Sequence, residues 1–272
     1  MNLAINYSPQ AAQLFADGRI HVDRFKCPDW PDMIEEARAL APVYVHFPLD
    51  AGTLSGRPCD LDAVDAMARD TNTPFINYHL VAYARDFPGV APDTEAPGVT
   101  ETVVERTMTE INRAIDRFGA DRVILENIPY FGGSGKYMRP SVDPAIMHRV
   151  INDTGCGFLL DLSHARIAAH YLGVDPHQYV ERMPLAQLRE LHLTGVDWVD
   201  GKLLDHMALA DEDIVWTQWA VDRIVAGAWA KPRLIAFEYG GIGEPFKWRS
   251  DASVIERDVN RLNEMLSVLK SE

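Results

Sequence analysis

The chain has 272 residues, of which 47% are hydrophobic and 24% charged, and its formal net charge is −14. One α/β barrel of about 250 residues would account for nearly all of this length. The acidic balance argues against non-specific binding to DNA or RNA, whose phosphates require a basic surface. The three cysteines form no CxxC pair, which excludes a thiolate zinc finger and argues against a disulfide framework.

The sequence shows neither a secretory signal nor a membrane-spanning segment. The opening residues, MNLAINYSPQ, lack the basic and apolar regions of a secretory signal. No run approaches the roughly 18 apolar residues that a membrane span requires. We therefore expect a cytoplasmic protein without membrane association, and the sequence predicts no particular oligomeric state.

Short apolar runs alternate with helical patterns along the whole chain. The predicted strands are residues 3–7, 20–25, 43–47, 75–80, 122–128, 158–162, 188–193 and 234–238. The predicted helices are residues 9–15, 28–40, 61–68, 99–118, 143–154, 165–172, 175–183, 214–229 and 252–269. Eight strands alternating with helices predict an α/β protein, a (β/α)8 TIM barrel that forms a single domain over residues 1–272. The second strand is the weakest of the eight because charged residues interrupt it. An open doubly wound sheet would need a glycine-rich fingerprint after the first strand, and NYSPQ is not one.

Polar residues follow most of these strands at their carboxyl ends. The stretch 157–164, GFLLDLSH, shows the arrangement, since an apolar run ends in Asp161 and His164 follows three residues later. The full set is His46, His79, Glu126, Asp161, His164, His192 and Glu238, to which the loop after the seventh strand adds Asp205 and His206. In a closed parallel barrel these ends converge on one mouth.

A metal site is the chemistry that this set favours. Crowded carboxylates repel one another unless cations neutralise them. Mixed imidazole and carboxylate ligation suits Fe, Zn or Mn, so we predict one to three divalent ions per chain. Any one of these histidines alone would be an ordinary hydrogen-bonded side chain, and the prediction depends on the joint pattern. Glu126 is central and could bridge two ions through its two oxygens.

The same residues resemble a known group of enzymes. The strand-end set, with the LEN tripeptide at 125–127 and the Asp161-x-x-His164 pair, is similar to the xylose-isomerase-like TIM-barrel superfamily, which includes AP endonuclease family 2. It looks most like the multinuclear branch. That branch contains endonuclease IV, with three zinc ions, and the multinuclear non-haem iron oxidative enzymes that modify cysteine-containing peptides. The resemblance covers about residues 40–240.

This resemblance implies roles for individual residues. One ion would be held by His46, His79 and Glu126, a second by Glu126, Asp161, His192 and Glu238, and a third by His164 and His206. Glu126 and Glu238 would also move protons, and His164 would touch the substrate. The family's third site uses Asp-x-His, whereas this chain reads Leu204-Asp205-His206. The third site is therefore expected to be distorted, supplied by Asp197 or Asp200, or empty.

Two glycine-rich loops, 132–135 and 240–243, belong to the expected mouth and allow close approach of a ligand to the backbone. The predicted substrate-binding residues are Asn127, Lys136, Arg139, Lys247, Trp248 and Arg249. The cations could bind a phosphate or carboxylate, and Trp248 could stack on a ring. The alternative is that these are surface loops with ordinary solvated charges.

Several functions stay open at this point. The first is a metalloenzyme with two or three cations that acts on a small polar or peptide substrate, as an iron-dependent oxidation. The alternative is a single-metal sugar isomerase or epimerase, for which Glu126, Asp161, His192 and Glu238 would suffice. A metal-dependent phosphodiesterase is disfavoured by the acidic charge. An eroded barrel that only binds a ligand is a fourth hypothesis.

Overall fold

The computed structural model describes residues 1–54, 59–241 and 249–270. The chain divides into two compact units, each made of separate segments. Unit 1 comprises Met1–His46, Asp70–Thr73 and Arg189–Glu272, and unit 2 comprises Phe47–Arg69 and Pro74–Leu188. The single domain over residues 1–272 stays a prediction.

Unit 1 contains five strands that pair in parallel in the order β3-β2-β1-β11-β8. They are β1 (Asn2–Asn6), β2 (Arg24–Cys27), β3 (Val43–Val45), β8 (Leu188–Leu193) and β11 (Leu234–Phe237). Each strand is short and almost wholly buried, as is usual where parallel strands are covered by helices.

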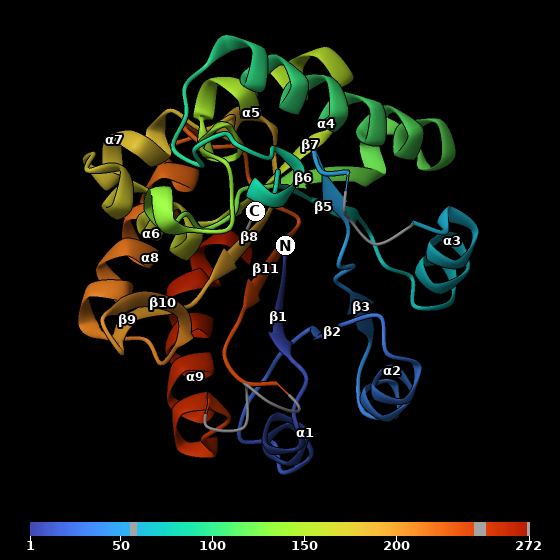
Figure 1. The fold of residues 1–272 in the computed structure, drawn as a ribbon. Helices are drawn as coiled ribbons and strands as arrows, with labels where there is room; N and C mark the ends of the chain where they lie inside the picture. Colours follow the sequence, from blue (N-terminus) through green and yellow to red (C-terminus); the bar gives the residue numbers. More distant parts are fainter. Residues whose placement is uncertain (55–58, 242–248, 271–272) are drawn as a thin grey trace. The chain divides into compact units, whose positions relative to one another are not determined.

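The helices of unit 1 are α1 (Pro9–Ala16), α2 (Pro31–Arg38), α8 (Asp211–Val225) and α9 (Ala252–Lys270). The predicted start of α1 is confirmed, because the Ser8 hydroxyl accepts a 3.1 Å hydrogen bond from the backbone N–H of Ala11. Helix α9 packs against both α1 and α8 (Figure 1).

An antiparallel hairpin in unit 1 was not predicted. Strand β9 (Gly195–Val199) pairs with β10 (Lys202–Met207) to form a separate two-stranded sheet. Asp200 and Gly201 connect them with positive φ angles of 50° and 75°. Two such residues are what a tight type I′ hairpin turn requires.

Unit 2 contains four strands that pair in parallel in the order β7-β6-β5-β4. They are β4 (Asp50–Ala51), β5 (Ile76–Leu80), β6 (Val123–Glu126) and β7 (Gly157–Asp161). Its α-helices are α3 (Leu61–Asp70), α4 (Pro97–Phe118), α5 (Pro144–Thr154), α6 (Leu162–Leu172) and α7 (Pro176–Glu181). Short 3-10 turns are η1 (Ala84–Asp86), η2 (Ala120–Arg122), η3 (Gly132–Ser134), η4 (Arg139–Val142) and η5 (Leu185–Gln187).

Aspartates begin most helices of unit 2. Asp143, Asp161 and Asp175 each accept a backbone N–H at the first turn of α5, α6 and α7. Asp60 precedes α3 and accepts from the backbone N–H groups of Asp62 and Ala63. These caps satisfy donors that a helix cannot satisfy internally.

All eight predicted strands occur, and the α/β class is confirmed. The second strand was placed too early: it is not residues 20–25 but Arg24–Cys27. Its charged side chains hid it, because Arg24 and Lys26 alternate with Phe25 and Cys27, although Lys26 is itself buried. The closure of eight strands into a barrel stays a prediction.

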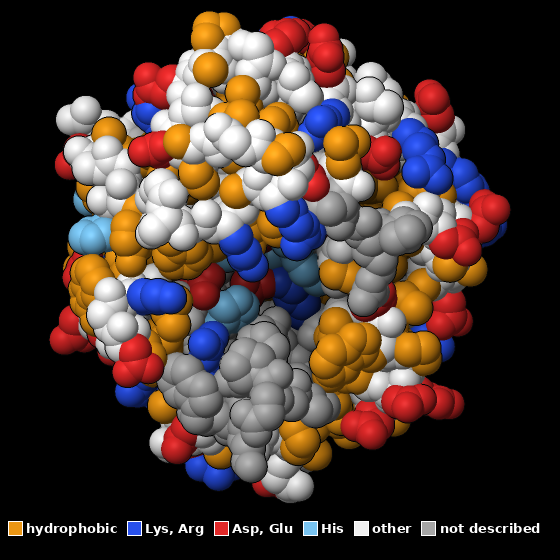
Figure 2. Space-filling view, in the orientation of Figure 1, with side chains coloured by type: hydrophobic (Ala, Val, Ile, Leu, Met, Phe, Trp, Pro, Cys, Tyr) orange, Lys and Arg blue, Asp and Glu red, His pale blue; other side chains and the backbone are white. Residues whose placement is uncertain are grey.

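The surface agrees with the acidic composition. Figure 2 shows acidic side chains scattered over one face of the molecule, with basic side chains between them. Within the described part of the chain, no helix is both long enough and apolar enough for a membrane span.

Candidate metal centre

The register of unit 1 places its polar residues on one face of the strands. Lys26 lies beside Asn6 on β1 and Tyr44 on β3, and His192 lies beside Ala236. Alternate residues of a strand share a face, so Glu238 follows Ala236 on the face of His192. Tyr44 and Ala236 also pack with Ala4 and Leu234 in a buried cluster.

His192 is the centre of the unit 1 cluster. Its Nδ1 lies 3.1 Å from Glu238 Oε1, and its Nε2 lies 2.9 Å from Glu190 Oε1. The Tyr44 hydroxyl donates a 3.1 Å hydrogen bond to the same oxygen of Glu190. The rings of His46 and His192 are 5.2 Å apart between centroids. The predicted strand-end residues His46, His192 and Glu238 are thus brought together, with Glu190 as an addition.

These residues fit a divalent metal ion. Ligand atoms of His46, Glu190 and His192 all lie within 4.8 Å of one another. Two imidazoles and a carboxylate form a donor set suited to Fe, Zn or Mn. Before an ion binds, the contact between Glu190 Oε1 and His192 Nε2 holds the imidazole in place.

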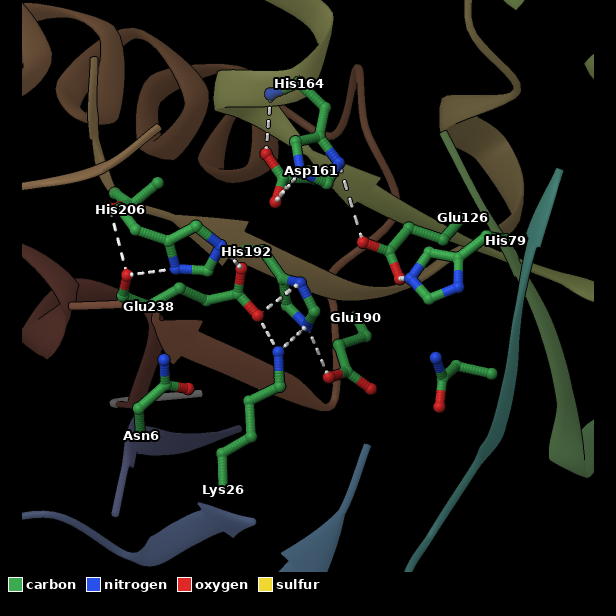
Figure 3. A network of polar contacts seen from close by, with 12 residues as sticks. Asn6, Lys26, His79, Glu126, Asp161, His164, Glu190, His192, His206 and Glu238 are labelled. Carbon is green, nitrogen blue, oxygen red and sulfur yellow. Dashed lines mark hydrogen bonds and ion pairs between the residues drawn. The ribbon is translucent and has the colours of Figure 1, made fainter. Parts of the chain in front are cut away.

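A buried lysine joins this cluster. Lys26 is 6% exposed, its Nζ is ion-paired with Glu238 Oε1, and it lies 3.5 Å from His192 Nε2. Figure 3 shows its side chain directed toward both residues. Lys26 was not predicted as a site residue.

His206 reaches Glu238 from the β9–β10 hairpin. The register shifts between Leu204 and Met207, and His206 has a φ of 59°. This bulge turns the imidazole so that Nδ1 lies 2.8 Å from the Glu238 carbonyl oxygen and Nε2 lies 3.8 Å from Oε2.

The neighbours proposed for the third site are placed differently. Asp205 accepts a 3.4 Å hydrogen bond from Arg249 through its backbone carbonyl, so its carboxylate as a ligand stays a prediction. Asp200 lies in the hairpin turn, and Asp197 accepts from the backbone N–H of Trp198.

The second cluster lies in unit 2. In the register of its strands, Asp50, His79 and Glu126 stand side by side, and Leu159 on β7 stands next to Glu126. Leu159 packs with Phe75 and Ile124 in a buried apolar cluster. His79 Nε2 is 3.3 Å from Glu126 Oε2. The other carboxylate oxygen of Glu126, Oε1, lies 3.7 Å from His164 Nδ1 (Figure 3).

The Asp161-x-x-His164 spacing has a structural as well as a chemical reason. Asp161 is the N-cap of α6, and its Oδ1 accepts a 2.7 Å hydrogen bond from the His164 backbone N–H. Its Oδ2 lies 3.6 Å from His164 Nε2. One oxygen therefore fixes the helix start while the other faces the imidazole. Unit 2 thus places the carboxylates of Glu126 and Asp161 next to the imidazoles of His79 and His164, and both are ligand types that divalent metals use.

The pKa of His79 reflects the charges around it in this cluster. Burial lowers the pKa of His79, but the carboxylates of Glu126 and Asp50 more than offset burial and raise it above the ordinary value. Asp50 Oδ1 lies 3.6 Å from His79 Nδ1. The protonated imidazole is thus favoured by negative charge on both sides.

The predicted substrate residues have varied surroundings. The Asn127 amide is engaged with the backbone of Asp161 through hydrogen bonds of 2.9 and 2.8 Å, which tie β6 to β7. Lys136 is exposed and lies over the Tyr137 ring, and Arg139 is ion-paired with Glu95. Arg249 is 9% exposed. Lys247 and Trp248 lie outside the described residues. A substrate role for all six stays a prediction.

Comparison with known proteins gives a family and a fold. A family model described as "RiPP precursor modification enzyme MbnB/TglH/ChrH" matches residues 27–235. A UPF0276 protein of Caulobacter vibrioides is 25% identical over 223 residues, 79% of this chain and 78% of that protein. A UPF0276 protein of Bordetella pertussis is 45% identical over 151 residues, 55% of this chain and 48% of that protein.

Two solved structures share the fold. D-psicose 3-epimerase from Clostridium cellulolyticum H10 has a TM-score of 0.60 and 13% identity, and the match covers 99% of each chain. L-ribulose 3-epimerase has a TM-score of 0.59 and 15% identity, covering 99% of this chain and 95% of that one. The resemblance to xylose-isomerase-like TIM barrels, drawn from the strand-end residues, is confirmed.

Proposed function

This chain belongs to the MbnB/TglH/ChrH family of RiPP precursor modification enzymes, and we propose that it is a metal-dependent enzyme that modifies a ribosomally made peptide. The family match over residues 27–235 carries this proposal. The two clusters support it, because each gathers nitrogen and oxygen donors that suit a divalent ion.

We assign one ion to each unit. His46, Glu190 and His192 would hold the ion of unit 1, and His79, Glu126, Asp161 and His164 the ion of unit 2. Iron bound there would supply redox chemistry with O2 as the oxidant, which is the reaction class that we favour. A peptide cysteine is the group that we expect to be oxidised.

The side chains of the two clusters would exclude water, contact the substrate and transfer protons. Glu190, His192 and Asp161 are at most 2% exposed, so they exclude water and hold their neighbours in place. His79 and His206 each have side chains that are 22% exposed, so in each unit these histidines would meet the substrate. Glu126 would accept or release a proton toward His79 or His164, which lie within 3.7 Å of its oxygens.

Sugar epimerisation is the alternative, because the solved structures of similar fold include sugar 3-epimerases. At 13–15% identity these share the fold alone. Such chemistry would need one ion and a carboxylate that shuttles a proton, and Glu126 or Glu238 would serve.

Metal content and substrate together test the proposal. We expect about two iron ions per chain by elemental analysis of protein purified without chelator. We also expect O2 consumption with synthetic cysteine-containing peptides and none with matched serine peptides. One ion per chain together with conversion of D-fructose to a 3-epimer would favour the alternative. A chain that binds no divalent metal after reconstitution would overturn both.

A further inference from the structure

A lysine is buried in the unit 1 cluster, where it is ion-paired with Glu238. Lys26 is the third residue of β2, and its ammonium group is ion-paired with Glu238. Both side chains are only 6% exposed. Lysine is almost never buried so deeply unless it is paired with an opposite charge.

The partners of Lys26 are groups that bind metals. Besides Glu238 Oε1, its Nζ lies 3.5 Å from His192 Nε2. The other oxygen of Glu238 lies 3.8 Å from His206 Nε2. Glu238 and His206 are therefore arranged as a pair of possible ligands, and the ammonium of Lys26 is already against one of them (Figure 3).

The position of the lysine follows from the strands. In the parallel register Lys26 stands between Asn6 and Tyr44. The same face carries Ala4 on β1 and Ala236 on β11, whose methyl groups leave room for the long lysine stem. The register of the strands thus places the ammonium group of Lys26 next to Glu238.

We propose that Lys26 is a built-in counter-cation that limits how many divalent ions the chain holds. While its ammonium is on Glu238, unit 1 binds one ion through His46, Glu190 and His192 and does not use Glu238 with His206 for another. The ammonium is in direct contact with Glu238 Oε1 but lies 3.5 Å from His192 Nε2, so its repulsion of a dication is strongest at Glu238. The ion at His46, Glu190 and His192 has three ligands to offset this repulsion. This inference rests on the proposed metal dependence.

Cobalt binding tests whether Lys26 limits the number of divalent ions that the chain holds. Chelator-treated protein is titrated with Co²⁺, and the number of ions is read from the visible d–d absorption and from elemental analysis after desalting. We expect Lys26→Met to bind one more Co²⁺ per chain than the wild type. Lys26→Arg keeps the charge and should bind the wild-type number. Lys231→Met, the same change at an exposed lysine of unit 1, should also leave the number unchanged.

A second readout covers the case in which Lys26→Met folds poorly. Lys26→Gln keeps a hydrogen-bond donor for Glu238 but removes the charge, and it should gain the same ion. Without metal both neutral variants should melt at lower temperature than the wild type, and Co²⁺ should raise their melting temperature more.

The outcomes separate this inference from the proposed function. Equal Co²⁺ numbers in wild type, Lys26→Met and Lys26→Gln would overturn the role of Lys26 and leave the metal-dependent function standing. If neither wild type nor variants bind Co²⁺, the proposed function fails as well.

Discussion

The buried carboxylates of Glu238 in unit 1 and Glu126 in unit 2 each have two histidines as ion-pair partners. In unit 1 a lysine, Lys26, is added as a further ion-pair partner of Glu238. Both carboxylates are at most 4% exposed, so each would be costly without a compensating charge. A lysine ammonium keeps its charge throughout the neutral pH range, whereas a histidine near pH 6.5 gains or loses its proton easily.

The two units therefore differ in how the negative charge of the carboxylate is balanced before a metal ion binds. Unit 1 carries its own cation and is held in place before any metal arrives. In unit 2 the histidines can release their protons and offer lone pairs to an ion. We therefore expect unit 2 to depend more on metal for its charge balance, and unit 1 to depend more on Lys26 for its stability.

The largest effect is expected when the lysine loses its carboxylate. Glu238→Gln leaves the ammonium of Lys26 buried beside a neutral amide, and removing one partner of a buried ion pair typically costs about 3–5 kcal/mol. The free energy of unfolding of chelator-treated protein, measured in urea, should fall by that amount. Glu264→Gln, an exposed glutamate of unit 1, is the matched control. Equal stability of the two variants would remove the distinction between the units.

A contrasting effect is expected from Glu126→Gln. Its ion-pair partners are histidines, which can become neutral, so stability of the metal-free protein should change far less than in Glu238→Gln. Metal affinity should fall instead, by at least about 10–100-fold, the loss seen when a residue merely supporting a metal ligand is removed. Titration with Co²⁺ measures it, and Glu105→Gln on the exposed face of α4 is the control. Unchanged affinity would show that Glu126 is not a ligand.

The sequence predicts those cluster residues that lie at the ends of apolar runs. His79, Glu126, Asp161, His192 and Glu238 all lie at or just after the carboxyl ends of buried strands. Within each unit, parallel strands bring such residues to one edge. The role of Asp161 as a helix cap was not predicted: α6 begins at Leu162, three residues before the predicted start at residue 165.

Lys26 and Glu190 were missed for a physical reason. A lysine in a strand is normally read as a surface residue whose stem packs and whose charge reaches water, and sequence alone does not distinguish this from a buried pair. Glu190 did carry a signal, because it lies two residues before His192 and alternation places both on one face. The Asp200-Gly201 dipeptide likewise marks a tight hairpin, although Asp200 had been considered as a metal ligand.

The smallest effect concerns protonation in unit 2. The raised pKa of His79 depends on the Glu126 and Asp50 carboxylates, against burial, which lowers it. A histidine whose pKa is raised on folding stabilises the fold fully below its unfolded value of about 6.5, and this contribution is lost as pH rises through the folded pKa. In metal-free protein, NMR titration of the imidazole should therefore show a His79 pKa above 6.5, and Glu126→Gln should lower it. A His79 pKa that does not respond to Glu126→Gln would mean that histidine protonation does not balance the charge of unit 2, and the contrast with the lysine of unit 1 would fail.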